Sequence, residues 1–323
     1  MIQMVKLING CDGAYHTINI HFTKACPHSC AWCVDKDNRI PMEAKDGPVA
    51  PNVKKIVNKV IELDNMRMIG ASAYEDVLFL GGEPLMYIKE LIDCIKRIQL
   101  NCPALRIYVT TSLPKIIMNK RKSLDELLSL VDGLNISLQH PNDMIASMML
   151  HTDEDAYDIK SVELNTDADI DNFIWRSELM RYLSNSQYKE KIRINLNLVK
   201  PWLCTKEHIM ECIDTIDQMG FGSIKLSELV GYPAGYVSFE KVFKVKLPSP
   251  YSHGCVSDIS NIIGCKTPIY LKRACFLVEP SLKASFSDGI KAIYKRIKKP
   301  YNDFIVVNEG GFTQRSWKEC GRI

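Results

Sequence analysis

Cys26, Cys30 and Cys33 lie in one short run, CPHSCAWC, with three and then two residues between them. Thiolates are soft ligands that select zinc or iron–sulfur clusters over hard cations. Three ligands on a four-iron cluster leave one iron open, whereas a structural zinc site needs a fourth ligand, and His28 is too close to two of the cysteines to supply it easily. The run therefore favours a cluster with one open iron, and a zinc knuckle or buried thiols are the alternative.

A second motif, Gly81-Gly82-Glu83-Pro84, follows the next apolar run along the chain. Two glycines at the end of a strand allow another group to approach the backbone closely. The Glu83 carboxylate can accept hydrogen bonds from an ammonium group. Alone, the motif is also consistent with an ordinary strand-to-helix turn. Beside the cysteine run, it places a cationic amino group next to the open iron.

Apolar runs of strand length alternate with segments of helical period, which indicates βα units around a parallel sheet. Strands are expected at residues 17–22, 77–80, 105–110, 134–138, 192–199 and 223–226. Helices are expected at residues 52–63, 88–98, 124–131, 170–183 and 206–219. A closed eightfold barrel needs about 250 residues, and the alternation stops near residue 230. We therefore expect an α/β fold with a partial (β/α)6 TIM-type barrel.

Loop and turn residues dominate after Val230, so we expect a barrel core over residues 1–235 and a C-terminal α+β extension over residues 236–323. Within the extension, residues 281–299 are helix-like, and a β-hairpin is expected with its turn at residues 308–311. The four cysteines of the extension are candidate ligands of an auxiliary 4Fe-4S cluster: Cys255, Cys265, Cys275 and Cys320. Because no CxxC pair occurs among them, ordinary thiols are the alternative, as we expect for Cys11, Cys94, Cys102, Cys204 and Cys212.

The composition excludes a disordered protein and disfavours several kinds of binding partner. The chain has 323 residues, 46% of them hydrophobic, which excludes an intrinsically disordered protein. The net charge of +3 gives no strong field, so binding to nucleic acid or to an anionic membrane is not favoured. No apolar run long enough for a signal peptide or a membrane span occurs, and we expect a cytoplasmic protein. In a reducing cytosol, 12 cysteines favour metal ligation or buried thiols over disulfides.

The CxxxCxxC run with an aromatic residue before its last cysteine, together with GGEP after the second strand, resembles the radical S-adenosylmethionine superfamily. The resemblance implies that Cys26, Cys30 and Cys33 ligate a 4Fe-4S cluster whose open iron binds S-adenosylmethionine. It also implies that the GGEP residues line the methionine amino group and that the Trp32 backbone lies near adenine. These cofactor-contacting residues are Gly81, Gly82 and Glu83. For Trp32, a side chain that only packs in the protein is the alternative.

Weaker assignments follow from the same resemblance. Ser112 and Ser137, at the ends of two strands, occupy places where the family often contacts ribose or carboxylate, although such hydroxyls also cap helices. Asn195, Asn197 and Glu228 are candidate substrate-side residues of the barrel, and solvated strand residues are the alternative. For Arg176 and Arg181, on an expected helix, a surface salt bridge is favoured over a carboxylate-binding role.

The resemblance implies an enzyme that cleaves S-adenosylmethionine reductively and uses the resulting radical to take a hydrogen atom from a substrate. An electron donor such as flavodoxin or ferredoxin is then a partner. We expect a peptide substrate, because the chain resembles the branch that contains molybdenum-cofactor and peptide-modifying enzymes. A small metabolite or nucleotide is the alternative substrate class. A zinc-binding interaction module is the alternative from a different functional class.

Overall fold

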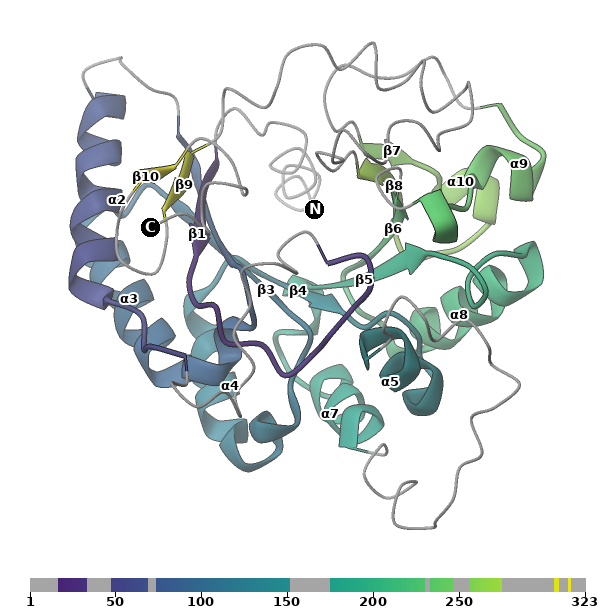
Figure 1. Cartoon of the computed structure of the whole chain (residues 1–323), viewed down its shortest axis with the longest axis horizontal. Coiled ribbons are helices and arrows are strands. Elements are labelled where there is room, and N and C mark those ends of the chain that lie inside the picture. Colours follow the sequence, from purple (N-terminus) through teal and green to yellow (C-terminus); the bar gives the residue numbers. More distant parts are fainter. Residues whose placement is uncertain are drawn as a thin grey trace.

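The computed structural model describes residues 17–33, 48–68, 74–151, 175–229, 233–246, 256–274, 305–307 and 313–314. Their strands form one sheet with the order β10-β9-β1-β2-β3-β4-β5-β6-β8-β7 (Figure 1). The strands are β1 (Thr17–His21), β2 (Asp76–Leu80), β3 (Arg106–Thr111), β4 (Gly133–Ser137), β5 (Ile192–Leu198), β6 (Ser223–Leu229), β7 (Val256–Asp258), β8 (Ile269–Ala274), β9 (Ile305–Val307) and β10 (Thr313–Gln314). Every neighbouring pair from β9 to β8 is parallel, and only the edge strands β10 and β7 pair antiparallel.

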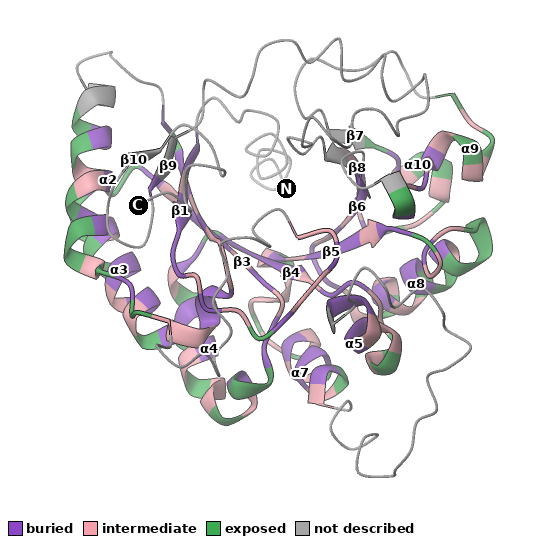
Figure 2. Ribbon diagram, viewed as in Figure 1, coloured by how far each residue is buried: buried purple, intermediate pink, exposed green. Residues whose placement is uncertain are grey.

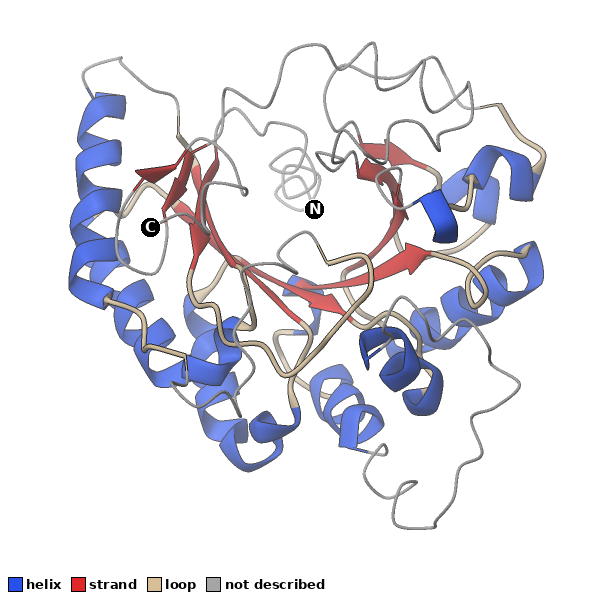
Figure 3. Cartoon of the chain, viewed as in Figure 1, coloured by secondary structure: helices blue, strands red, loops and turns tan. Residues whose placement is uncertain are grey.

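Helices follow most of the parallel strands and lie on the convex side of the curved sheet (Figure 3). The α-helices are α2 (Val53–Met68), α3 (Ile88–Asn101), α4 (Arg121–Leu130), α5 (Asp143–His151), α7 (Trp175–Ser184), α8 (Lys206–Met219), α9 (Phe239–Phe243) and α10 (Ser260–Ile263). The short 3-10 helices are η1 (Pro84–Tyr87), η2 (Lys115–Lys120), η4 (Lys189–Lys191) and η5 (Pro233–Gly235). This arrangement is the predicted α/β partial barrel. No helix in the described ranges has the length and apolar character needed to cross a membrane.

The strands separate an apolar face from a polar face. In β5, Ile192, Ile194, Leu196 and Leu198 are buried in the core that the sheet shares with the helices (Figure 2). Because side chains alternate along a strand, the intervening residues of β5 face the concave side of the sheet. The same alternation holds in β6 and β8, whose core residues include Ile224 and Ile269. The concave face of this half of the barrel is therefore polar.

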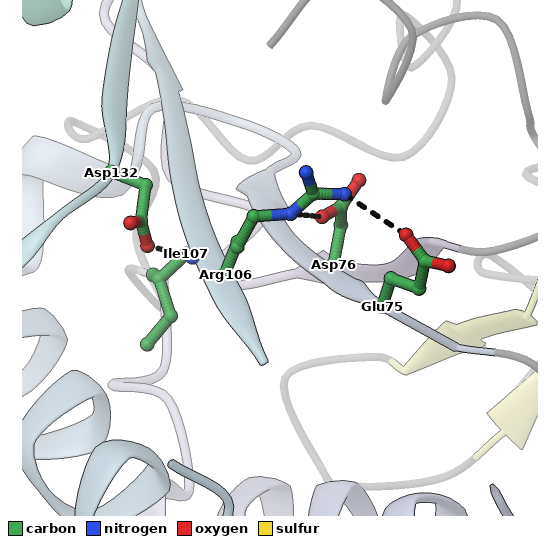
Figure 4. Close-up of polar contacts among 5 residues, drawn as sticks. All are labelled: Glu75, Asp76, Arg106, Ile107 and Asp132. Carbon is green, nitrogen blue, oxygen red and sulfur yellow. Dashed lines mark hydrogen bonds and ion pairs between the residues drawn. The ribbon is translucent and has the colours of Figure 1, made fainter. Parts of the chain in front are cut away.

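A polar cluster fixes the amino ends of β2 and β3 (Figure 4). Arg106 Nε donates to Asp76 Oδ1 at 2.6 Å, and Arg106 Nη2 donates to Glu75 Oε2 at 3.2 Å. The Ile107 amide donates to Asp132 Oδ2 at 2.7 Å. Burial raises the pKa of Asp76, and the Arg106 charge opposes that rise. Since these groups satisfy one another at the amino ends, the cluster supports the fold at the edge opposite the cysteine loop.

The described strands after residue 235 extend the same sheet. β8 pairs with β6, and β9 pairs with β1, so strands from the C-terminal third cover both edges of the six-stranded core. An uncovered parallel edge would leave backbone N–H and C=O groups unpaired, which explains why short strands add there. β9 and β10 pair antiparallel, as the expected hairpin requires. Its turn at residues 308–311 and the expected helix at 281–299 lie outside the described residues, and the division at residue 235 stays a prediction.

Candidate active site

The cysteine loop leaves β1 and is held by the last turn of α5. The Ser29 amide donates to the Leu150 carbonyl at 2.9 Å, and Cys30 Sγ donates to the same oxygen at 3.4 Å. The Cys33 amide donates to the Cys30 carbonyl at 3.1 Å, which closes the loop. Cys26, Cys30 and Cys33 are all partly exposed thiols. A helix that the sequence did not predict therefore positions the central cysteine.

The donor set of the loop suits an iron–sulfur cluster. In the described ranges, no three side chains of His, Cys, Asp or Glu surround a single point as ligands of one metal ion would. The thiolates of a 4Fe-4S cube each bind a different iron, so their sulfurs do not need to meet at one point. Cys26, Cys30 and Cys33 are therefore a donor set that could hold three corners of a 4Fe-4S cluster.

Two other side chains of the loop, those of His28 and Trp32, contact other parts of the protein. His28 Nε2 lies 2.9 Å from Ser112 Oγ, and His28 is 7% exposed. The Trp32 ring packs edge-to-face against Trp202, with ring centroids 6.5 Å apart. Trp32 also packs against a small cluster that includes Met149. The Trp32 side chain thus anchors the loop, which leaves its backbone as the part predicted to lie near adenine.

The GGEP turn packs directly on the cysteine loop. The Glu83 amide donates to the Ala25 carbonyl at 2.7 Å. Gly82 has φ +54°, and a Cβ there would lie 2.5 Å from the carbonyl oxygens of both Thr23 and Ala25. Gly81 has φ +83°, and a Cβ there would lie 2.4 Å from the His21 ring. The glycines are needed because β1 and the start of the cysteine loop lie against the turn, which the sequence alone did not reveal.

Glu83 is the centre of a buried hydrogen-bond network and is 1% exposed. Its Oε1 accepts from Thr111 Oγ1 at 2.6 Å and from the Leu85 amide at 3.0 Å. Its Oε2 accepts from the Ser112 amide at 2.7 Å and from Ser112 Oγ at 2.5 Å. A carboxylate has about four acceptor positions, and the protein fills four here. Glu83 therefore joins the GGEP turn to the end of β3, and through Ser112 to His28.

The protonation of Glu83 depends on two opposing effects. Burial raises the pKa of its carboxyl group. Hydrogen bonds from Ser112, Thr111 and the Leu85 amide favour the ionised form and oppose the rise. Since Ser112 Oγ donates to Glu83, it accepts from His28, which assigns the proton to His28 Nε2. The site thus has a defined chain from the cysteine loop to the GGEP carboxylate.

Ser137, Asn195 and Asn197 lie near the carboxyl ends of β4 and β5. Ser137 is the register partner of Asn195. Asn195 is 7% exposed, and its Oδ1 is buried without a hydrogen-bond partner. All three residues lie on the concave face by alternation with core neighbours. Their roles toward ribose or substrate stay predictions.

Glu228 lies differently from its expected position on the substrate side. It alternates with Lys225 and Ser227 and shares the convex face with Leu226. Glu228 is 0% exposed, and its Oε1 accepts from the Phe239 amide at 2.7 Å, at the start of α9. The sequence could not show this role, because α9 follows a loop whose return onto β6 depends on tertiary structure. We therefore do not carry Glu228 into the proposed site.

Arg176 is buried, although the sequence predicts a surface salt bridge for it. The residue is 1% exposed, and its Nε and Nη1 lack hydrogen-bond partners. Its guanidinium lies over the Trp175 ring, 4.5 Å from the centroid. Burial lowers the pKa of Arg176 to about 10, while Asp143 and Cys30 oppose that shift. Arg181, on the same helix, is exposed as expected.

A buried guanidinium with unfilled donors is costly unless an anion is present. Arg176 is electrostatically coupled to Cys30, whose thiolate would carry negative charge as a cluster ligand. The orphaned nitrogens therefore fit an anionic group at the cysteine loop. The only signal in the sequence is a basic residue within the expected helix 170–183, and many surface residues share this signal.

Of the four cysteines that are expected to hold an auxiliary cluster, Cys265 is the one within the described residues. Cys255, Cys275 and Cys320 lie outside the described residues. Cys265 follows α10, and both burial and a hydrogen bond with Asp217 raise the pKa of its thiol. A raised pKa disfavours the thiolate that ligation requires. The second cluster stays a prediction.

The other described cysteines behave as ordinary thiols. Cys94 and Cys102 are buried in the core, and Cys204 Sγ donates to the Pro201 carbonyl at 3.1 Å. Cys212 Sγ lies 3.3 Å from His140 Nε2. Burial raises the pKa of Cys212 to about 12, and burial beside His208 lowers the pKa of His140 to about 4. Both members of this pair are therefore neutral near pH 7. Cys11 lies outside the described residues.

Comparison with known proteins gives a family match and a fold match. Residues 11–145 match the family model of a 4Fe-4S single cluster domain. No curated protein matches the sequence. The structure of SuiB from Streptococcus suis, bound to the precursor peptide SuiA, is similar with a TM-score of 0.54 at 13% identity, over 99% of this chain and 64% of SuiB. This chain thus spans less than two thirds of the length of SuiB.

Two further solved structures show weaker similarity. BtrN in complex with AdoMet and 2-DOIA matches with a TM-score of 0.28 at 19% identity, over 38% of this chain and 46% of BtrN. HydG, a maturase of the FeFe-hydrogenase, matches with a TM-score of 0.39 at 12% identity, over 76% of this chain and 51% of HydG. The 4Fe-4S domain match covers both the cysteine loop and the GGEP turn, and the fold is the expected partial barrel. The comparisons thus show a 4Fe-4S single cluster domain over residues 11–145 and a fold similar to that of SuiB.

Proposed function

We propose that this chain is a radical S-adenosylmethionine enzyme that modifies a peptide. When bound, the cofactors supply the reductive cleavage of S-adenosylmethionine to methionine and a 5′-deoxyadenosyl radical, which takes a hydrogen atom from the substrate. The observation that carries the proposal is the direct contact of the two motifs. The Glu83 amide binds the Ala25 carbonyl, one residue before Cys26, so the thiols and the GGEP turn form one site.

In this proposal the residues of the chain hold and orient the cofactors. Cys26, Cys30 and Cys33 hold the cluster, with Cys30 steadied by the Leu150 carbonyl. Gly81 and Gly82 keep the turn close to the loop and expose its backbone to the methionine amino group. Glu83 serves as a positioning residue, because its four acceptor positions already bind Thr111, Ser112 and the Leu85 amide.

The remaining assignments concern the anionic and nucleoside parts of the site. Arg176 supplies buried positive charge beside Cys30. Ser112 links His28 to Glu83, and its hydroxyl is therefore part of the support of the site. Ser137 and the Trp32 backbone remain the candidate contacts for ribose and adenine.

A peptide is the substrate class that the comparisons support best. SuiB was solved with a precursor peptide bound, and its fold matches nearly the whole of this chain. The concave face near the carboxyl ends of β5 and β6 is polar, as a surface that binds peptide groups requires. An electron donor such as flavodoxin or ferredoxin and a cytoplasmic location complete the proposal.

The test is anaerobic reconstitution with iron and sulfide, followed by reduction in the presence of S-adenosylmethionine and measurement of 5′-deoxyadenosine. We expect the wild-type protein to form it and Cys30→Ala to form none. Cys204→Ala is the matched control, because Cys204 is also partly exposed but lies outside the CxxxCxxC run and donates to the Pro201 carbonyl. Equal product from Cys30→Ala and the control would refute the assignment of Cys30 as a cluster ligand.

A further inference from the structure

We propose that His28 is a positioning residue of the cleavage reaction. Through Ser112, His28 sets the position of the cysteine loop relative to Glu83 of the GGEP turn, so that one molecule of S-adenosylmethionine reaches the open iron and the turn together. The inference rests on the proposed function and deepens it, because it names the side chain that joins the two motifs. His28 lies between Cys26 and Cys30 and is not among the proposed cluster ligands.

The His28 side chain reaches from the cysteine loop to the residue that follows β3. His28 Nε2 lies 2.9 Å from Ser112 Oγ, and the two residues are 84 positions apart in sequence. His28 is 7% exposed. A hydrogen bond in a buried environment is electrostatically stronger than one in water, which suits a contact that holds a loop in place.

Ser112 connects His28 to the Glu83 carboxylate. The amide and the hydroxyl of Ser112 both donate to Glu83 Oε2, at 2.7 and 2.5 Å. The single hydroxyl proton lies toward Glu83, so Ser112 Oγ accepts from the proton-bearing Nε2 of His28. Two donors on one oxygen fix the direction of the carboxylate. A shift of His28 therefore disturbs the contacts of Glu83 Oε2.

The other carboxylate oxygen of Glu83 is held independently. Oε1 accepts from Thr111 Oγ1 at 2.6 Å and from the Leu85 amide at 3.0 Å. Because Leu85 belongs to η1 and Thr111 ends β3, Glu83 is fixed between two elements. Ser112 is therefore a fixed point, to which His28 attaches the cysteine loop.

The His28 bond gives the cysteine loop a second attachment to the GGEP turn. The Glu83 amide donates to the Ala25 carbonyl at 2.7 Å, one residue before Cys26, and His28 lies two residues after Cys26. A single contact allows a segment to pivot, whereas contacts on both sides of Cys26 fix its direction. The two attachments together therefore define where the loop lies relative to the turn.

The turn after β3 is held in a strained conformation. Leu113 has φ +59°, in the left-handed region that is unfavourable for leucine, and it is 0% exposed. The Leu113 amide donates to Thr111 Oγ1 at 2.8 Å, which supports this conformation. Strained residues persist where the surrounding structure requires them, and they cluster at functional sites. Since Leu113 directly follows Ser112, the strain maintains the placement of Ser112 between His28 and Glu83.

The test compares two substitutions of His28 in the anaerobically reconstituted protein. His28→Gln keeps a donor, because a glutamine amide nitrogen can occupy the place of Nε2, whereas His28→Leu puts an apolar side chain of similar volume there. Affinity is measured as the S-adenosylmethionine concentration that gives half of the shift in the electron paramagnetic resonance g-values of the reduced cluster. We expect His28→Leu to weaken the affinity about tenfold, and His28→Gln to stay within about twofold of the wild-type protein.

Iron content and the cluster signal without S-adenosylmethionine should be unchanged in both variants, because the three cysteines and the contacts of the loop with the Leu150 carbonyl remain. His208→Leu is the control, since His208 is exposed on α8 and contacts the Trp202 carbonyl. A His28→Leu protein that binds S-adenosylmethionine like the control would overturn the inference, as would a His28→Gln protein as weak as His28→Leu. Loss of iron from His28→Leu would also overturn it, since His28 would then serve cluster assembly.

A second arm measures the link between His28 and Ser112 in the cluster-free protein. His28→Leu, Ser112→Ala and the double variant are compared by urea denaturation. Because either substitution breaks the same hydrogen bond, the double variant should lose less stability than the sum of the two single variants. Additive losses would overturn the link between the two residues.

The wild-type protein separates failure of this inference from failure of the proposed function. If it takes up no iron, or forms no 5′-deoxyadenosine, the proposed function is wrong and the inference fails with it. If it does both, and His28→Leu binds S-adenosylmethionine as tightly as the wild-type protein, only the inference is wrong.

Discussion

Replacement of Glu83 by Gln tests whether this carboxylate supports the site by accepting four hydrogen bonds. A glutamine can keep its oxygen at the Oε1 position, where it accepts from the Leu85 amide and Thr111 Oγ1. Its amide nitrogen then faces the Ser112 amide, and two donors oppose each other. One buried donor without an acceptor costs about 1–3 kcal/mol, so we expect Glu83→Gln to destabilise the fold by about 2 kcal/mol.

Glu83→Ala removes both acceptor oxygens. The hydroxyl groups of Thr111 and Ser112 can rotate toward other partners, but the amides of Leu85 and Ser112 cannot. Two buried amides without acceptors give an expected loss of about 4 kcal/mol. Relief of the buried charge, seen in the raised pKa of Glu83, opposes part of this loss. The alanine variant should therefore be the less stable of the two, by about 1–2 kcal/mol.

The assay is urea denaturation of the cluster-free protein, followed by circular dichroism. Glu62→Gln is the control, because Glu62 is on the exposed face of α2 with 59% side-chain exposure and should change stability by less than about 0.5 kcal/mol. If Glu83→Gln is as stable as the wild-type protein, the network does not support the fold. Normal stability together with lost affinity for S-adenosylmethionine would instead show that Glu83 contacts the cofactor directly.

Three further predictions concern the turn, a buried histidine and the buried arginine. Gly82→Ala should reduce stability by at least about 3 kcal/mol in the same denaturation assay. Gly264→Ala is the control, because Gly264 has φ +77° but nothing lies within 4 Å of the new Cβ, and it should cost about 1 kcal/mol. Equal losses of stability in the two variants would contradict the close packing of the GGEP turn. The pKa of His140 is lowered to about 4, so on acidification the unfolded state binds a proton at this residue before the folded state does, and the free energy of unfolding should fall as pH decreases from about 6.5 to about 4. His140→Gln should remove on the order of 1–2 kcal/mol of that fall, which is less than the full pKa shift allows because the residue is partly exposed. Arg176→Gln should lower the midpoint potential of the reconstituted cluster by tens of millivolts, on the order of a tenfold change in its reduction equilibrium, because it removes a buried positive charge near Cys30. Arg176→Lys keeps a positive charge and should recover most of the potential. Equal potentials in the wild-type protein and both variants would contradict the electrostatic coupling between Arg176 and Cys30.

The barrel core was predictable from the sequence because its signals are local. The expected helix 206–219 matches α8, since Thr205 caps its start by accepting from the His208 amide, and Gly220 ends it with φ +69°. The strands alternate or run apolar over their whole length, and their expected bounds agree with β1 to β6 within a few residues. The CxxxCxxC run and the GGEP motif each consist of residues that are adjacent or nearly adjacent in sequence, so both could also be recognised from the sequence.

Features that depend on distant contacts were not predictable. α5 has the sequence DMIASMMLH, whose apolar residues have no clear helical period, and its importance comes from the Leu150 carbonyl that holds Cys30. β8 follows a turn-rich segment and has no helix pattern before it, so only its pairing with β6 defines it. The burial of Arg176 depends on how α5 and α7 meet, as the bond from the Ser177 amide to Asp143 shows. These relations join residues that are far apart in sequence or that lack a local pattern.

Electron paramagnetic resonance of the reduced, reconstituted protein tests the central claim most directly. The claim is that Cys26, Cys30 and Cys33 hold a 4Fe-4S cluster with one iron open to S-adenosylmethionine. The account predicts the signal of a reduced 4Fe-4S cluster whose g-values shift when S-adenosylmethionine is added, and no such signal from the cysteine loop in Cys30→Ala. A signal that S-adenosylmethionine leaves unchanged, or a protein that takes up zinc and no iron, would contradict it.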